Sequence, residues 1–394
     1  MPRNRPAPGA AEWAALVSLT GPHPRAPTGP LDWDRLIDIA LRHKALALLS
    51  NGIAKEGVEP PQAAREKLNA AARKTVTRSL ALARETVLVA RAFEQAGIAM
   101  TVLKGVPLSQ AIHGRIDRRD PGDIDILIPP ERLPDAAQVL ASLGYHSGHT
   151  LLLATPRQRD RLTRLHKDLE FFCPDRRIAL ECHWSLARGR AGMRMDNPDP
   201  PATAPVEIGG TAIRTLTPAR TVVYLCAHGA VHYWLRLKWL NDLRWIFHDP
   251  RLIAGDWDSV AQKAQETGMT RVVMATARLV QAMDGGALPD GLRHIDTAPR
   301  QTERKAGAML RYLTRTGGAL TDPEPGMIAR NVFLVQRLRA AARDEATGAD
   351  ILRQNWTPGV DDLMMADLPE ALEWGYVPLR LMRIMRRGRS GAGR

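Results

Sequence analysis

The sequence has little cysteine and no long hydrophobic run. Its three cysteines, Cys173, Cys182 and Cys226, show no C-x-x-C spacing, which argues against a disulfide framework or a zinc ribbon and favours a reducing cytoplasm. No apolar stretch approaches the ~18 residues that a membrane span needs. Residues 1–6 lack the apolar segment of a signal peptide. We therefore expect a soluble, cytoplasmic protein without a membrane span.

Acidic residues are too few to balance the basic ones. The net charge is +13 and the pI is near 10.2, which favours polyanionic ligands such as nucleotides. The arginines are spread along the chain and form no concentrated block. A nucleic-acid partner would need such a basic face, and we do not expect one.

The length of 394 residues and the hydrophobic content of 44% predict one compact catalytic unit with helical additions. Residues 1–30 are rich in proline, alanine and glycine, which predicts an irregular arm. Residues 31–97 show helical spacing, residues 98–215 a mixture of strands and helices, and residues 216–394 a C-terminal helical domain. Within the α/β part, residues 186–215 carry several prolines and glycines and are expected to be a loop.

The rest of the chain is organised around Gly122-Asp123-Ile124-Asp125-Ile126-Leu127-Ile128. In an extended strand alternate side chains point to opposite faces, so Asp123 and Asp125 share one face while the isoleucines share the other. Two neighbouring carboxylates repel unless a cation lies between them, and a divalent ion prefers such oxygen ligands. An edge strand with an acidic solvent face is the alternative.

A second motif precedes this strand. Residues 98–103 read as a short strand, Lys104-Gly105 as a tight exit, and residues 107–113 as a helix with proline in its first turn. Backbone N–H groups at a helix N-terminus attract anions. We therefore expect them, together with Lys104 and Ser109, to form a site for a triphosphate.

Together these motifs resemble the DNA polymerase β-like nucleotidyltransferase superfamily. More closely, Leu103-Lys104-Gly105 and the later R-x-x-x-D-I-D-I-L-I beginning at Arg119 resemble a bacterial nucleotidyltransferase family found beside exopolysaccharide and lasso-peptide biosynthesis genes. The resemblance implies an α/β (α+β) fold, with a small mixed nucleotidyltransferase sheet flanked by helices and with helical regions at both ends. It also implies a phosphate or acceptor role for Arg119. Two features depart from the superfamily: Val106 follows Gly105 where a glycine or serine is usual, and the spacing to Asp123 is longer.

The superfamily also places a third carboxylate on a later strand. Residues 177–184 alternate between apolar and polar side chains, and Glu181 lies opposite the apolar set. Glu181 matches the family's acidic-x-His-Trp motif, which implies that it completes the metal site. Asp168 and Glu170 share a strand face and are the rival ligands. For His183, a role beside the site and a packed strand position remain open.

The helical part after Thr217-Pro218 contains two further candidates. The stretch from Leu237 to Leu243 resembles the family's L-K-x-L-x-D-L, and the superfamily commonly uses a basic residue of this region on the triphosphate, which implies that role for Lys238. A lysine that flanks a packed helix is the alternative. His228 and His232 have the spacing of zinc ligands, but Gly229 stands where H-E-x-x-H has glutamate, which argues against a metalloprotease.

The resemblance implies a Mg²⁺- or Mn²⁺-dependent enzyme that moves a nucleoside monophosphate from an NTP, with ATP as the expected donor, to a small-molecule, sugar or peptide acceptor. Asp123, Asp125 and Glu181 would be its catalytic and metal-binding residues, and Lys104, Gly105, Ser109, Arg119 and Lys238 would bind the nucleotide. The alternatives are a non-catalytic nucleotide-binding or scaffold protein of a biosynthetic cluster, and a toxin-like enzyme that modifies RNA or protein.

Overall fold

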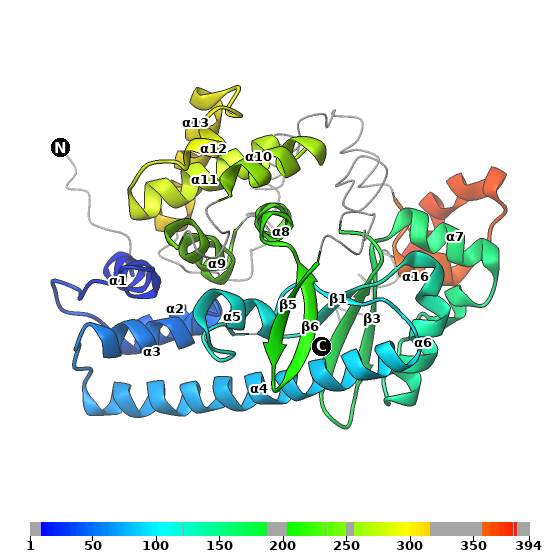
Figure 1. Cartoon of the computed structure of the whole chain (residues 1–394), viewed down its shortest axis with the longest axis horizontal. Coiled ribbons are helices and arrows are strands. Elements are labelled where there is room, and N and C mark those ends of the chain that lie inside the picture. The colour runs from blue at the N-terminus through cyan, green and yellow to red at the C-terminus, as the bar shows by residue number, and fades with distance from the viewer. Residues whose placement is uncertain are drawn as a thin grey trace. The chain divides into compact units, whose positions relative to one another are not determined.

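The computed structural model of the chain confirms a mixed α/β fold (Figure 1). It describes residues 9–120, 122–186, 203–232, 234–249, 256–315, 357–380 and 382–383. The chain folds as two compact units that alternate along the sequence. Unit 1 comprises Met1–Val87, Val102–Gly122 and Pro200–Asp344, and unit 2 comprises Leu88–Thr101, Asp123–Asp199 and Glu345–Arg394.

The described sheet of unit 2 has β4 (Ile178–His183) between two neighbours. It is parallel to β2 (Ile124–Leu127) and antiparallel to β3 (Asp168–Cys173). In β4, Ile178, Leu180 and Cys182 are buried and alternate with the partly exposed Ala179 and Glu181. This burial pattern confirms the predicted strand and its buried face, because successive strand residues point to opposite sides.

The helices of this part of unit 2 lie between β2 and β3 in the sequence. Residues after β2 form the short turn η1 (Pro130–Arg132) and then α6 (Leu133–Ser142). Next come the turn η2 (Thr150–Leu153) and α7 (Pro156–Leu165). The Thr155 hydroxyl accepts a hydrogen bond from the backbone N–H of Gln158 at 3.2 Å, and Pro156 occupies the first turn. Both features fix the start of α7.

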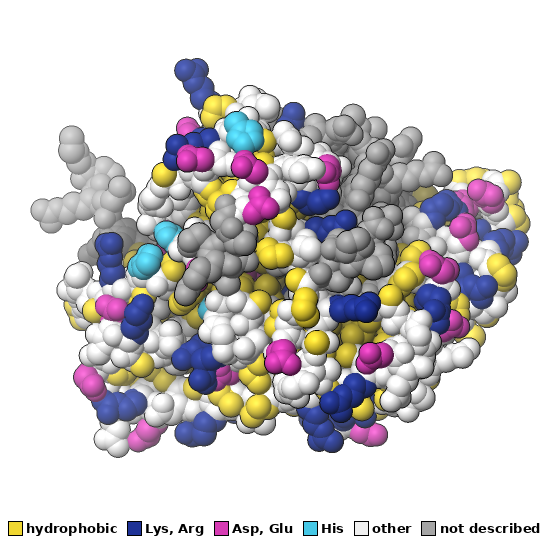
Figure 2. All heavy atoms as spheres, in the orientation of Figure 1, with side chains coloured by type: hydrophobic (Ala, Val, Ile, Leu, Met, Phe, Trp, Pro, Cys, Tyr) yellow, Lys and Arg dark blue, Asp and Glu magenta, His cyan; other side chains and the backbone are white. Residues whose placement is uncertain are grey.

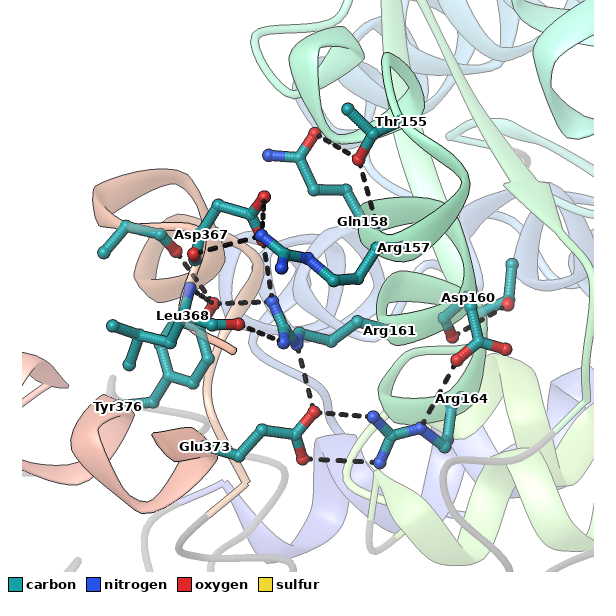
Figure 3. A network of polar contacts seen from close by, with 12 residues as sticks. Thr155, Arg157, Gln158, Asp160, Arg161, Arg164, Asp367, Leu368, Glu373 and Tyr376 are labelled. Carbon is teal, nitrogen blue, oxygen red and sulfur yellow. Dashed lines mark hydrogen bonds and ion pairs between the residues drawn. The ribbon is translucent and has the colours of Figure 1, made fainter. Parts of the chain in front are cut away.

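Arginines of α7 hold a segment from the far end of the sequence, and we call these contacts the C-terminal clamp (Figure 3). The segment contains α16 (Val360–Met365) and the turn η5 (Glu370–Gly375). The Arg161 side chain is 3% exposed; it donates to Glu373 at 3.1 Å, to Asp367 at 3.1 Å and to the Tyr376 hydroxyl at 3.0 Å. Arg157 and Arg164 donate to Asp367 and Glu373, both at 2.6 Å. Residues 357–383 therefore belong to unit 2 and not to a continuous C-terminal helical domain.

The strands of unit 1 include a hairpin that the sequence analysis assigned to a loop. β5 (Thr203–Ile208) and β6 (Thr211–Leu216) are antiparallel, and Val102 of β1 (Thr101–Val102) pairs with Thr215 in parallel. Gly209 and Gly210 have φ values of 55° and 72°. Positive φ at both turn residues is the geometry that two-residue hairpins favour. The prediction of a loop is wrong for residues 203–215, and the rest of that loop, with Arg188, Arg190 and Arg194, lies outside the described residues.

The irregular arm predicted for residues 1–30 is wrong for residues 10–20, which form α1 (Ala10–Thr20). This stretch has no internal proline or glycine, and Trp13, Leu16 and Leu19 recur at helical spacing and are buried. Other helices of this unit are α2 (Trp33–Arg42), α3 (Leu46–Lys55), α5 (Val106–His113), α8 (Pro218–Val231), α9 (Leu237–His248), α10 (Trp257–Glu266), α11 (Thr270–Asp284), α12 (Asp290–Arg293) and α13 (Pro299–Arg315). The long helix α4 (Gln62–Gln95) begins in unit 1 and ends in unit 2.

On the face shown in Figure 2, the described basic side chains do not gather in one place. Figure 2 shows Lys and Arg dispersed among Asp and Glu over the visible face. In the described part of the chain, no helix combines the length and the apolar character that a membrane crossing requires.

Candidate active site

Three carboxylates lie side by side across the sheet of unit 2. The strand register pairs Asp125 with Glu181 and pairs Glu181 with Glu170. Laterally paired residues of neighbouring strands project from the same face. Asp125 is fully buried, Glu181 is partly exposed and Glu170 is exposed, so the row runs from the interior of the unit to solvent.

His183 completes a compact group with two of these carboxylates. Its Nε2 atom lies 3.4 Å from Asp125 Oδ1 and 3.2 Å from Glu181 Oε2. On the other side of the ring, Nδ1 lies 3.7 Å from Asp168 Oδ2, and that carboxylate also contacts the ammonium group of Lys167. His183 is buried, so a ring placed between acidic groups on both sides is firmly positioned.

The electrostatics of the group favour a positive charge at its centre. Burial lowers the pKa of His183, but its contacts with Asp125 and Glu181 outweigh burial and hold the pKa above its ordinary value. Two adjacent carboxylates in a buried position are unstable without a cation. A protonated His183 would supply that charge, and a metal ion would supply it equally well.

The donor set fits a divalent metal ion. One ligand atom from each of Asp125, Glu181 and His183 lies within 4.8 Å of the other two. An ion with ligands at ~2.1 Å spans about 4 Å between opposed donors, so small movements would suffice. Carboxylates suit Mg²⁺ and Mn²⁺, while imidazole is a poorer ligand for Mg²⁺ than for transition metals.

The structure brings two of the three predicted metal ligands together, because Glu181 lies beside Asp125 as predicted. The rival carboxylates are placed differently. Asp168 contacts Lys167, and Glu170 lies one strand farther from Asp125 than Glu181 does. Asp123 directly precedes β2 and lies outside the three-residue group. His183 was not among the predicted ligands, although the acidic-x-His-Trp motif had marked it.

We expect Glu181→Gln to weaken Mn²⁺ binding about tenfold or more, a loss of ~1.4 kcal/mol, because the neutral amide contributes less charge to the ion. Glu170→Gln is the matched control, since it removes a carboxylate from the neighbouring position of the same row. Isothermal titration with Mn²⁺ measures both. Weakening by Glu170→Gln with unchanged binding in Glu181→Gln would move the third ligand position to Glu170.

The predicted nucleotide-binding cations lie in unit 1 around one buried acid, Asp242 of α9. Arg119 Nε donates to both carboxylate oxygens of Asp242 at 3.0 Å, and both side chains are at most 4% exposed. Burial raises the pKa of Asp242, while Arg119, Lys238 and Lys104 act in the opposite direction. Three of the predicted residues therefore form a basic cluster, which we call the Asp242 cluster.

The Gly105 turn leads into α5 as predicted. Gly105 has φ 82° and ψ −134°, a conformation that favours glycine, and Pro107 lies in the first turn of the helix. Val106, at the position where the superfamily usually has glycine or serine, is buried. The departure from the superfamily therefore places an apolar side chain in the core at the start of α5.

The Ser109 hydroxyl makes two hydrogen bonds within the protein. Its hydroxyl donates to the carbonyl oxygen of Arg115 at 2.7 Å and accepts from the backbone N–H of Arg119 at 3.2 Å. These bonds fix the segment that delivers Arg119 to Asp242. The nucleotide-binding role predicted for Ser109 remains a prediction. The observed contacts hold the backbone of Arg115 and Arg119 in place.

His228 of α8 and His232, which caps that helix, pack against an aromatic ring. The His228 and His232 rings are 4.7 Å apart, and the His232 ring stacks on Trp239 of α9 at 4.8 Å. These rings therefore form an aromatic contact between the two helices. Zinc proteases have a glutamate directly after the first histidine, and here that position is Gly229.

A comparison with known protein families also points to a nucleotidyltransferase. Residues 29–285 match the model of a family described as "Uncharacterised nucleotidyltransferase". No curated protein matches the chain. Among solved structures, the antibiotic-resistance factor ANT(2'')-Ia is similar over 50% of this chain and 89% of its own, with 14% identity and a TM-score of 0.28, too low to carry a conclusion. Because the family match covers more than half of the chain, the protein belongs to this nucleotidyltransferase family and is an enzyme that transfers a nucleoside monophosphate.

Proposed function

We propose that the protein transfers a nucleoside monophosphate from an NTP, with ATP as the expected donor, to a hydroxyl or phosphate group of a small-molecule, sugar or peptide acceptor and releases pyrophosphate. The observation that carries this proposal is the group formed by Asp125, Glu181 and His183 on one sheet face in a member of a nucleotidyltransferase family. The proposal requires Mg²⁺ or Mn²⁺.

Asp125 and Glu181 would hold the ion, with His183 beside them and Asp123 at the edge of the site. When bound, such an ion supplies charge neutralisation at the reacting phosphate. The chain's own contribution is position: β2 and β4 fix the carboxylates in register, and the buried His183 ring contacts both of them through Nε2. Phosphoryl transfer depends mostly on such positioning and on charge stabilisation.

The Asp242 cluster would bind the triphosphate. Lys104 and Lys238 supply positive charge, the Gly105 turn presents backbone N–H groups of α5, and Asp242 holds Arg119 in a fixed orientation. A helix N-terminus and nearby cations both stabilise a polyphosphate. We assign direct phosphate contacts to Lys104 and Lys238 and a positioning role to Arg119.

The test begins with binding, because it needs no acceptor. Titration of ATP in the presence of Mn²⁺ should give a saturable signal that disappears when the metal is chelated. Each of the four NTPs, labelled at the α-phosphate, is then incubated with mixtures of hydroxyl-bearing small molecules, sugars and peptides, and the mass of each labelled product identifies the acceptor. Absence of metal-dependent binding for every NTP would refute the proposal.

We expect Lys238→Gln to raise the dissociation constant of ATP·Mn²⁺ about tenfold, because a charge-assisted contact to phosphate is worth ~1.5–3 kcal/mol. Titration calorimetry measures the change. Lys74→Gln is the control, since Lys74 is an exposed lysine of α4 in the same unit. Unchanged affinity in Lys238→Gln would reduce Lys238 to a lysine that flanks the packed helix α9.

A further inference from the structure

We propose that a cavity at the C-terminal end of α5 is a second binding site, which takes a small organic anion with a flat apolar body. The cavity has a volume of about 630 Å³ and lies within unit 1. Its walls include Leu48, Ile112, His113, Arg115, Arg118 and Trp245. Cavities of this size hold small-molecule ligands in other proteins.

This cavity is separate from the triphosphate position proposed above. Gly105 precedes α5 and the cavity wall includes Gly114 after its last residue, so α5, which has 8 residues, lies between the two. At 1.5 Å per residue this helix separates its ends by about 12 Å. The cavity and the proposed triphosphate position are therefore two different sites.

The cavity wall carries two guanidinium groups, and within the described residues only one of them has a hydrogen-bonded carboxylate. Arg115 is paired with Asp117 through two hydrogen bonds of 2.9 and 2.8 Å. The Arg118 side chain makes no hydrogen bond or ion pair within the described residues, and burial together with Arg115 lowers its pKa against the opposing effect of the Asp117 carboxylate. Asp249, the acidic wall residue, has an interaction of its own. A half-buried guanidinium in this position is satisfied best by a carboxylate or phosphate, which match its fork of donors.

The other walls select a flat apolar body. The rings of His113 and Trp245 meet edge to face at 4.7 Å, and the Trp245 indole N–H donates to the Thr20 carbonyl at 3.1 Å, which fixes the ring. Burial, Arg118 and Arg119 lower the pKa of His113 to about 4, so His113 is neutral at pH 7 and adds no charge. Leu48 and Ile112 are buried and apolar. An aromatic phosphate monoester or carboxylate combines both requirements.

The test measures ligand binding through the ¹⁹F signal of Trp245, which lies in the cavity wall. The whole protein is labelled with 5-fluorotryptophan, and the Trp245 signal in the ¹⁹F spectrum is assigned by its loss in Trp245→Phe. Phenyl phosphate and benzoate are titrated separately, and they distinguish a phosphate head group from a carboxylate. We expect a saturable shift of the Trp245 signal with at least one of them. Phenol, which lacks the charge, should shift it at least about tenfold more weakly.

Arg118→Gln should weaken this binding by about 10–100-fold, and Arg118→Lys by less, because it keeps the charge but loses the fork. Arg73→Gln, an exposed arginine of α4, is the control and should bind as the unchanged protein does. A Trp245 signal that neither anion moves, or that moves equally in Arg118→Gln, would overturn the proposal. Lys238→Gln, which weakens binding at the Asp242 cluster, should leave the Arg118-dependent shift of the Trp245 signal unchanged, so this proposal and the proposed transfer reaction can fail separately.

Discussion

Asp125→Asn is expected to reduce nucleotidyl transfer by ~10³-fold or more. Asp125 is fully buried and shares the group with Glu181 and His183. The substitution removes a negative charge while keeping the shape of the side chain, so the lost metal-site stabilisation of several kcal/mol should appear in the rate. Pyrophosphate release with the NTP and acceptor found in the product screen measures the change.

Asp123→Asn should also abolish transfer, because the D-x-D pair is expected to act as a unit. Circular dichroism and the thermal midpoint should match those of the unchanged protein in both variants. Glu170→Gln controls for loss of charge on the same sheet face and should retain transfer. A variant of Asp125 that keeps half of its activity would remove this residue from the metal site. If Asp123→Asn keeps its activity while Asp125→Asn loses it, the metal site consists of Asp125, Glu181 and His183 without Asp123.

Arg119→Met is expected to lower the free energy of unfolding by about 3–5 kcal/mol, since it leaves the Asp242 carboxylate buried without its hydrogen-bond donor. The pair is at most 4% exposed, and its two contacts are 3.0 Å long. Chemical denaturation in urea, followed by far-ultraviolet circular dichroism, measures the loss.

The double variant Arg119→Met with Asp242→Leu separates the two roles considered for Arg119. Replacing both charges with apolar groups of similar size should recover most of the lost stability, because no unpaired charge remains. ATP·Mn²⁺ binding is measured in parallel. If Arg119→Met unfolds at the same urea concentration as the unchanged protein but loses ATP binding, Arg119 is a phosphate ligand and the positioning role is wrong.

Local patterns predicted the elements that carry the site. The alternation along residues 177–184 was enough to place Glu181 opposite the buried face, because a strand has only two faces. The glycine at position 105 and the proline two residues later were enough to place the start of α5. The hairpin β5–β6 was missed although Gly209-Gly210 between two alternating stretches is its signal. The prolines of the preceding residues had led to a loop assignment.

Contacts between distant residues were not predictable in the same way. Arg119 and Asp242 are 123 positions apart, and nothing in the local spacing of either residue indicates the other. The family motif had therefore suggested a ligand role for Arg119, whereas the structure shows it buried against an acid. His183 illustrates the same limit, because its strand position predicts a face and does not predict which carboxylates the ring meets.

The C-terminal clamp has a consequence for the order in which the chain matures on the ribosome. Arg161 is synthesised 212 positions before its partner Glu373, and translation proceeds at about 5–20 residues per second. For about 10–40 s, Arg157 and Arg161 therefore stand along α7 without Asp367 and Glu373, and Arg164 has only its contact with Asp160 at 3.9 Å. Like charges at such spacing weaken a helix. The nascent unit 2 can pair β2, β3 and β4 early, and the Trp184 indole N–H can already donate to the Thr163 carbonyl of α7, but the arginine contacts with Asp367 and Glu373 must wait for the last part of the chain. During that interval it is an open substrate for chaperones and proteases.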